Sequence, residues 1–419
     1  MKTTSFEISR ELSPENITEL QSKIGGQPST WTVDEIGDGN VNLIFRIQGP
    51  NGQALVKQAV PYLRCVGEAW PLSLKRNYFE YRALQEHSAV AAEYLPKVFA
   101  FNEKSALMVM EFLGNHIILR KGVMSGKKYP HFSEHITDYI AKTLFYTSDL
   151  YLNAGQKKEK MKLFCDNVDL CKITEDLIFT DPYRKADQNR WTTPQLDSIV
   201  REFSEDAPLK TAVAKMKAKF LTSAQALIHG DLHTGSIMVN ENETKVIDPE
   251  FAFYGPMGFD VGLLLANFLM GYFSQAGRGA HENERVEYEK WLLQQVQEIW
   301  SKFSVKFSRL WDQDLKGDFL TPGFVGCDSG LEIIRQVRAE YMENLFQDSI
   351  QFAGTEMIRR TLGLAHVADL DSIADPDQRA LCETRVLRMA RNLLINKNYK
   401  TIDDVIVAAQ KLRATQSVS

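Results

Sequence analysis

The sequence has no surplus of positive charge and no long uninterrupted apolar run. Its 49 Lys and Arg residues are outnumbered by 54 Asp and Glu residues, which gives a formal net charge of −5 at pH 7. A nucleic-acid-binding protein needs a basic surface to neutralise phosphates, so this composition argues against that class. The longest apolar run, residues 261–273, is too short to span a bilayer and is interrupted by Gly262, Asn267 and Gly271. We therefore expect a buried helix there and no membrane contact.

Two further absences concern the cellular compartment. The first 25 residues lack the continuous apolar stretch of a secretory signal, because Glu7, Arg10 and Lys23 are among the charged residues within them. The five cysteines are an odd number, and no two have C-x-x-C spacing. Scattered single cysteines are typical of unpaired thiols in a reducing compartment. These features predict a cytoplasmic protein.

The 419 residues, of which 44% are hydrophobic and 25% charged, are enough for one large core or two coupled cores. The pattern changes once along the chain. Up to about residue 113 it indicates strands and turns with one helix, and beyond that point helical periods dominate. This predicts an α+β protein with a small β-rich N-terminal lobe, residues 1–113, and a large, mostly helical C-terminal lobe, residues 114–419.

In the first lobe, two short apolar runs flank the glycine-bearing turn 37–40, as in a β-hairpin. Residues 74–85 carry apolar or aromatic side chains every three or four positions, which predicts a helix. A further strand leads into residues 111–114. The expected strands are residues 31–36, 42–47, 53–60 and 106–110.

In the second lobe, helical periods cover residues 135–152 and 209–226. Two short strands, residues 236–240 and 244–247, follow and are joined by the polar turn 241–243. This second hairpin matters because acidic motifs stand at both of its ends.

The motif before this hairpin is HGDLHTGS, residues 229–236, and the motif after it is DPEF, residues 248–251. Phosphoryl transfer needs clamped phosphates and one carboxylate that orients the attacking hydroxyl and accepts its proton. Asp231 suits the second task, and Asp248 suits metal binding. The arrangement resembles the H-R-D-x-x-x-x-N and D-F-G motifs of protein kinases, which imply a two-lobed protein-kinase-like fold.

Two departures from the protein-kinase pattern concern the metal. Ser236 replaces the metal-binding asparagine, and Pro249-Glu250 replaces Phe-Gly. Glu250 can therefore supply the second carboxylate, since Mg²⁺ prefers carboxylate oxygen, water and phosphate. We expect His233 to be structural, and Asp260 to hold backbone amides or cap the following apolar helix rather than touch substrate.

The same template predicts an ATP site upstream. Gly37, Gly39 and Asn40 form the candidate phosphate loop, where glycines let backbone amides approach phosphate. Lys57 lies on a strand whose alternation directs it beneath that loop. Its expected ion-pair partner is Glu80 on the next helix, with Glu86 as the alternative. The expected hinge that contacts adenine comprises Glu111, Phe112 and Leu113.

Longer motifs narrow the resemblance to the 5-methylthioribose kinase family. The ending Thr-Gly-Ser of the first motif is the most discriminating piece, and the likeness covers nearly the whole chain. The residues that carry it are 229–236 (HGDLHTGS), 248–260 (DPEFAFYGPMGFD), 358–366 (IRRTLGLAH), 56–59 (VKQA), Trp70-Pro71 and Asp181-Pro182-Tyr183.

This resemblance implies transfer of the ATP γ-phosphate to the 1-hydroxyl of 5-methylthioribose, in methionine salvage. It implies that Asp231 is the base, that Asp248 and Glu250 hold Mg²⁺, and that the enzyme is a homodimer. Arg359 and Arg360 would reach sugar or phosphate oxygens, as a planar fork of donors can. Without the family they would instead be a solvent-facing basic pair. Trp70 either lies near the sugar or belongs to the core.

Two alternatives remain open at this point. The first is another kinase of the same fold, acting on an aminoglycoside, choline, homoserine or a different sugar. A cationic substrate would need an aromatic cage or an acidic cluster, whereas a thioether needs an apolar pocket. The second is a catalytically inactive kinase-like binding module. Such a module commonly lacks one of the residues equivalent to Lys57, Asp231, Asp248 and Glu250, all of which are present.

Overall fold

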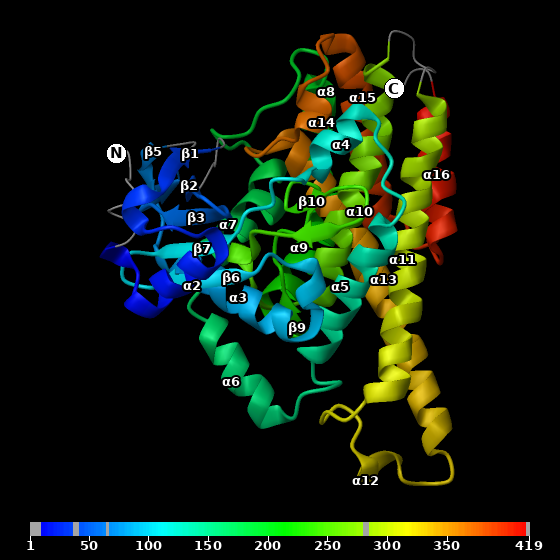
Figure 1. Cartoon of the computed structure of the whole chain (residues 1–419). Helices are drawn as coiled ribbons and strands as arrows, with labels where there is room; N and C mark the ends of the chain where they lie inside the picture. The colour runs from blue at the N-terminus through cyan, green and yellow to red at the C-terminus, as the bar shows by residue number, and fades with distance from the viewer. Residues whose placement is uncertain (1–9, 37–41, 64–66, 280–284, 416–419) are drawn as a thin grey trace.

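The computed structural model describes residues 10–36, 42–63, 67–279 and 285–415. A β-rich region formed by the first third of the chain lies beside a larger helical body (Figure 1). The predicted α+β class, with a small β-rich region and a large, mostly helical remainder, is confirmed.

The main sheet has five antiparallel strands in the order β1-β2-β3-β7-β6. The predicted first hairpin is present, because β1 pairs with β2. The pattern did not predict β6 or the helix α2 (Pro14–Ile24), whose Leu20 and Ile24 pack on one face of the sheet. The strands are β1 (Thr32–Glu35), β2 (Asn42–Gly49), β3 (Gly52–Ala59), β6 (Val98–Asn102) and β7 (Leu107–Glu111).

The register of β3 sets the direction of Lys57. Lys57 pairs with Ile44 of β2 and with Met108 of β7. Side chains alternate between the faces of a strand. Val56 therefore packs in the α2-side core, and Lys57 faces the opposite side, toward α3 (Lys75–Ala91). This helix is longer than the predicted 74–85.

The helical body is built around α10 (Met257–Ser274), in which every residue is buried. Gly262 lets α10 approach α13 (Gly330–Leu362) closely, because a Cβ there would lie 2.5 Å from the Ser349 carbonyl oxygen. One helix, Met257–Gly277, is apolar and long enough to cross a membrane by length and composition, and it is wholly buried in the protein. This confirms the predicted buried helix.

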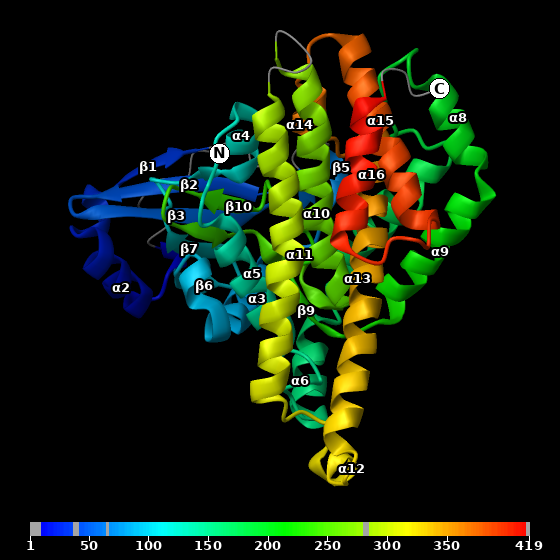
Figure 2. The same cartoon turned by 90° about the vertical axis from the view of Figure 1, so that its right-hand side faces the viewer.

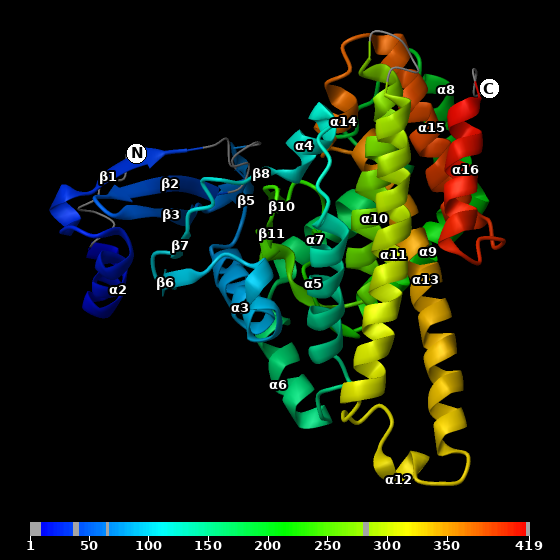
Figure 3. The same ribbon diagram turned by 45° about the vertical axis from the view of Figure 1, so that its right-hand side comes forward.

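Long helices surround α10. Helices α11 and α13 run beside it and extend beyond the body as a hairpin with α12 at its tip (Figures 2 and 3). The remaining helices of the body are α4 (Leu119–Ser125), α5 (Phe132–Tyr146), α6 (Ala154–Phe164), α7 (Val168–Phe179), α8 (Asp197–Glu205), α9 (Ala207–Thr222), α11 (Val286–Asp314), α12 (Pro322–Val325), α14 (Ala368–Asp371), α15 (Pro376–Ile395) and α16 (Ile402–Ala414).

Short strands form further small sheets, and the HGDLHTGS and DPEF motifs adjoin β9, β10, β11 and β12. The predicted second hairpin is present as β10 and β11, and β10 also pairs with β8. The predicted helix 209–226 was too long, because Ala226 instead begins β9, which pairs with β12. The predicted helix 135–152 likewise ends at Tyr146. These strands are β4 (Tyr62–Leu63), β5 (Gly67–Pro71), β8 (Ile117–Ile118), β9 (Ala226–Ile228), β10 (Ile237–Val239), β11 (Thr244–Val246) and β12 (Phe253–Gly255).

Candidate active site

The HGDLHTGS motif forms the loop between β9 and β10, and its glycine is required by a close backbone approach. Gly230 has φ +82°, and a Cβ there would lie 2.2 Å from the Phe251 carbonyl oxygen. A side chain at this position would therefore be strained and would clash with backbone. This contact explains why glycine stands where protein kinases have arginine, and it brings the HGD and DPEF motifs together.

The buried side chains of Asp260 and His229 hold this loop in place. Asp260, in the first turn of α10, accepts hydrogen bonds from the backbone N–H groups of His229 (2.6 Å) and Gly230 (3.0 Å). His229 Nδ1 accepts from the Asp231 N–H at 3.3 Å, and its Nε2 lies 2.9 Å from the Ile247 carbonyl oxygen. The prediction that Asp260 organises backbone amides is confirmed. His229 links the loop to the residue before Asp248.

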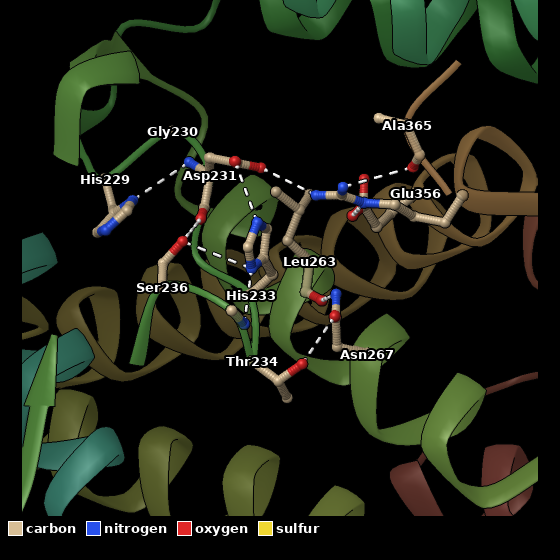
Figure 4. A network of polar contacts seen from close by, with 12 residues as sticks. His229, Gly230, Asp231, His233, Thr234, Ser236, Leu263, Asn267, Glu356 and Ala365 are labelled. Atoms are coloured by element: carbon tan, nitrogen blue, oxygen red, sulfur yellow. Dashed lines mark hydrogen bonds and ion pairs between the residues drawn. The ribbon is translucent and has the colours of Figure 1, made fainter. Parts of the chain in front are cut away.

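Asp231 lies at the centre of a polar cluster (Figure 4). Its Oδ1 is 3.1 Å from Arg359 Nη2 and 3.3 Å from Arg360 Nη2, and its Oδ2 is 3.2 Å from His233 Nε2. Both arginines are buried, so the alternative of a solvent-facing pair is wrong. Burial alone would raise the pKa of Asp231, but the His233 hydrogen bond and the two guanidinium groups hold it well below its ordinary value.

Glu356 holds both guanidinium groups from the opposite side. Its side chain is fully buried, its Oε2 accepts from Arg359 Nε at 2.7 Å, and its Oε1 accepts from Arg360 Nε at 2.7 Å. Burial opposes ionisation, yet the two guanidinium charges lower the pKa of Glu356. The sequence prediction missed this residue. The available signal was its spacing, since side chains three and four positions apart meet on one helix face.

Lys57 joins the two regions of the molecule. Its Nζ lies 2.8 Å from the Glu80 carboxylate and 2.6 Å from Asp248 Oδ1. The predicted Lys57–Glu80 ion pair is confirmed, and the alternative partner Glu86 pairs with Lys160 instead. Burial lowers the pKa of Lys57, but the surrounding carboxylates raise it by more, so the ammonium stays charged.

Asp248 and Glu250 are the candidate metal ligands. Asp248 adopts φ +62°, a left-handed conformation that is uncommon outside glycine and occurs often at functional sites. Its side chain is 43% exposed. Glu250 is buried, and its Oε2 lies 3.1 Å from Asn42 Nδ2 and 3.8 Å from Arg76 Nε. Two carboxylates two residues apart, one of them open to solvent, are a donor set that fits Mg²⁺.

Ser236 has a different role from the asparagine that it replaces. Its Oγ donates to the Asp231 carbonyl oxygen at 3.0 Å and so closes the turn of the catalytic loop. The carboxylate of Glu250 is thus the better candidate for a second metal ligand. Arg76 and Asn42, which position Glu250, were missed by the sequence prediction because single residues at these sites form no motif.

Four predicted positions lie wholly or partly outside the described residues. Gly37, Gly39 and Asn40 lie outside the described residues, and so does the side chain of Trp70, whose backbone belongs to β5. The expected hinge follows β7, with Phe112 in the linking segment.

The backbone groups of this hinge are partly used. The Glu111 N–H donates to the Lys97 carbonyl at 2.8 Å, and the Leu113 carbonyl accepts from the His116 N–H at 3.1 Å. Adenine binding at Glu111, Phe112 and Leu113 stays a prediction.

A buried lysine–glutamate pair next to two loop carboxylates defines a protein-kinase-like phosphotransferase. In agreement, residues 32–298 match the family described as "Phosphotransferase enzyme family". Methylthioribose kinase 1 of Oryza sativa subsp. japonica is 43% identical over 93% of this chain and 91% of its own length. Methylthioribose kinase of Escherichia coli O45:K1 (strain S88 / ExPEC) is 46% identical over 92% of each chain.

The chain therefore belongs to the methylthioribose kinase family of phosphotransferases. The predicted resemblance and the predicted enzyme class, an ATP-dependent kinase, are confirmed. Among solved structures, an ethanolamine kinase of Plasmodium vivax has a TM-score of 0.41 at 13% identity, covering 87% of this chain and 85% of that chain.

Proposed function

We propose that this enzyme transfers the γ-phosphate of ATP to the 1-hydroxyl of 5-methylthioribose, giving the 1-phosphate for methionine salvage. The observation that carries the proposal is the buried cluster in which Asp231 faces Arg359 and Arg360. A carboxylate next to two guanidinium groups can orient a hydroxyl and also balance the charge of a transferring phosphoryl group. The names of the relatives supply the choice of acceptor.

On the nucleotide side, residues 1–113 would bind ATP. Lys57, held by Glu80, is positioned to pair with nucleotide phosphates, as the corresponding lysine does in kinases. The loop with Gly37, Gly39 and Asn40 would cover these phosphates. Asp248 and Glu250 would hold Mg²⁺, and when bound the ion neutralises charge on the β- and γ-phosphates.

On the acceptor side, residues 114–419 would bind the sugar and carry the base. Asp231 would accept a hydrogen bond from the 1-hydroxyl and take its proton as the new O–P bond forms. Arg359 and Arg360 have further N–H donors for sugar or phosphoryl oxygens. The buried carboxylate of Glu356 would keep both forks in place while substrate takes over their contacts with Asp231.

The two alternatives are not favoured. Relatives over 40% identical along nearly the whole chain are named methylthioribose kinases, rather than kinases of choline, homoserine or aminoglycosides. The residues that an inactive module commonly lacks, Lys57, Asp231, Asp248 and Glu250, are all present. Lys57 interacts with Asp248 and Glu250, and the loop of Asp231 is linked through His229 to Ile247, next to Asp248.

The deciding experiment is ADP release by the purified protein with Mg-ATP and 5-methylthioribose. Ribose, choline, homoserine and kanamycin are run beside it at equal concentration. We expect release with 5-methylthioribose to exceed that with every other acceptor. Preference for another acceptor would keep the kinase assignment and overturn the substrate. The absence of release with all five would contradict the proposed function.

We also propose a cytoplasmic homodimer, as the family resemblance implies, with no nucleic-acid or membrane partner. Exposed apolar residues on the α11–α13 hairpin and the segment between these helices, Phe319, Phe324 and Leu331, support self-association. Size-exclusion chromatography with light scattering tests the dimer. A monomer at micromolar concentration, with unchanged activity, would contradict it.

A further inference from the structure

We propose that His233 is a positioning residue for phosphoryl transfer: as a neutral imidazole with its proton on Nε2, it donates to Asp231 Oδ2 and fixes the plane of that carboxylate. The proposal rests on the proposed function, in which Asp231 is the base. It replaces the sequence expectation of a purely structural His233.

The hydrogen-bond partners of Nδ1 determine the tautomer. The Gly235 backbone N–H points at Nδ1 from 2.8 Å, and Arg120 Nη2 lies 3.3 Å from the same atom. An amide N–H and a guanidinium can only donate, so Nδ1 must offer its lone pair. A proton on Nδ1 would face two other donors. The ring proton therefore resides on Nε2.

The acceptor for that proton is Asp231. His233 Nε2 lies 3.2 Å from Asp231 Oδ2, while Arg359 and Arg360 both contact Oδ1. Because the two guanidinium groups keep the carboxylate ionised, the Nε2–H donates to it. Figure 4 shows the imidazole between Asp231 and the following turn of the loop.

The charged groups around His233 support a neutral ring. Burial lowers the pKa of His233 to about 4; Asp231 opposes this shift, and Arg360 and Arg120 reinforce it. At pH 7 the imidazole is thus uncharged, in agreement with the hydrogen-bond geometry.

Arg120, which contacts the ring, is itself held by other residues of the helical body. Arg120 is fixed by Asp369 Oδ2, 3.3 Å from its Nε, and by Asn267 Oδ1, 3.1 Å from its Nη2. A Cβ at Gly235 would lie 2.6 Å from the His233 ring, so glycine keeps the space that the imidazole occupies. His233 is therefore a fixed support for Asp231.

The two carboxylate oxygens of Asp231 then have different roles: Oδ2 accepts from His233, and Oδ1 faces the acceptor. When Arg359 and Arg360 turn toward substrate oxygens, the His233 bond stays on Oδ2 and keeps Oδ1 directed at the acceptor. The hydroxyl proton then passes to Oδ1 as the acceptor oxygen bonds to the γ-phosphorus and the bond from γ-phosphorus to the ADP oxygen breaks.

Two matched variants separate this role from simple support of the loop. His233→Gln can place an amide N–H near the position of Nε2 but offers no acceptor to Gly235. His233→Asn can place an amide oxygen near the position of Nδ1 but cannot reach Asp231. We expect the Gln variant to stay within about tenfold of wild-type kcat and the Asn variant to lose roughly 10- to 100-fold, the range for misplaced catalytic geometry.

In both variants the KM for ATP should be unchanged. The fall of kcat/KM at low pH, the acid limb of the pH profile, should move to higher pH in His233→Asn. The reason is that Asp231 loses a hydrogen bond that favours its charged form. His233→Gln should leave that limb in place. Equal losses in both variants, a larger loss in the Gln variant or an unmoved limb in the Asn variant would overturn the proposal.

A second measurement does not depend on turnover. Nitrogen-15 NMR of histidine-labelled wild-type protein at pH 7 distinguishes the two neutral tautomers from imidazolium, and the His233→Gln spectrum assigns the signal. We expect the Nε2–H tautomer. An imidazolium or an Nδ1–H signal would refute the proposal even if the kinase reaction is as proposed. Wild-type protein with this tautomer but no kinase activity would instead refute the proposed function.

Discussion

The proposed nucleotide side and the proposed acceptor side of the site are built in different ways. On the nucleotide side, Lys57 reaches from the β-rich region to Asp248 of the helical body, whose side chain is 43% exposed. On the acceptor side, Asp231 meets Arg359 and Arg360, whose side chains are 10% and 7% exposed, inside the helical body. The first contact joins the two regions: its Lys57–Glu80 pair is buried, and Asp248 is the member open to solvent. The second lies within the helical body, and its most exposed member is Asp231, at 22%.

This difference has an energetic meaning. Water and salt screen an ion pair with an exposed partner, whereas a buried cluster is screened little and depends on every member being matched. Screening therefore applies to the Lys57–Asp248 contact and much less to the buried Lys57–Glu80 pair. The acceptor side is fixed in advance, with Glu356 balancing its two cations. Substitutions on one side, with their effects measured on both sides, test this comparison.

The largest effect is expected at the centre of the acceptor side. Asp231→Ala removes the proposed base, and kcat should fall by roughly 10²- to 10⁴-fold, the typical contribution of a positioned acid–base group. Steady-state kinetics with 5-methylthioribose measures this change. The affinity for ATP should be unchanged, because Asp231 does not belong to the proposed ATP-binding residues. Near-wild-type turnover in a folded variant would remove Asp231 from the chemistry.

The second effect concerns stability. Glu356→Gln removes one of the two carboxylates that form direct ion pairs with the buried Arg359 and Arg360, and the free energy of unfolding should fall by about 3 kcal/mol, as for a broken buried ion pair. Urea unfolding at pH 7 measures it. Glu332→Gln, at an exposed position on the same helix α13, is the control and should be nearly neutral. Equal stability of both variants would show that the cluster is not balanced through Glu356.

The third prediction compares the KM values of two variants, one with a substitution on each side of the site. Arg360→Ala should raise the KM for 5-methylthioribose about 10- to 100-fold, the range for lost hydrogen bonds to charged groups, and change the KM for ATP little. Lys57→Ala should show the reverse pattern. Isothermal titration with each ligand separates binding from turnover. Parallel losses for both ligands in both variants would mean that the two sides act as one unit.

The fourth prediction concerns the metal. Glu250→Gln should raise the Mg²⁺ concentration needed for half-maximal activity about tenfold, the lower end for perturbed metal sites. A magnesium titration at saturating ATP measures it, with Glu241→Gln in the exposed β10–β11 turn as the control. If the two titrations coincide, Glu250 serves only as a partner of Arg76 and Asn42.

Local patterns predicted the parts of this enzyme that depend on short spacing. The second hairpin, the Lys57–Glu80 pair and the role of Asp260 all follow from residues with a known template or a clear period. Element ends were less predictable. The ends of α5 and α9 are set by tertiary strand pairing and local turns, which override helical periodicity.

The acceptor side was predictable only through family resemblance. Arg359 is 128 positions from Asp231, and helical spacing gives no sign that the two side chains meet. The burial of the pair depends on close packing of α13 against α10, which Gly262 permits. Glu356 has helical spacing to both arginines, but its burial and the contact of His233 with Asp231 required the three-dimensional structure.

The smallest effect is expected in the pH profile of the wild-type enzyme. As the proposed base Asp231 must be ionised, and its surroundings hold its pKa well below its ordinary value of 3.8. The ionised form is therefore complete at pH 5, and activity is lost only as pH falls through the lowered pKa. Between pH 5 and 6 Asp231 should change kcat/KM by less than about twofold.

Arg359→Ala sharpens this last test. It removes one of the two cations on Oδ1, so the pKa of Asp231 should rise and the acid limb should move to higher pH. The control is Arg184→Ala, a change to an exposed arginine that pairs with Asp181 far along the chain from Asp231. A limb that moves equally in both variants, or in neither, would show that the buried cluster does not set the charge of Asp231. The acceptor side would then share the solvent-screened character of the nucleotide side.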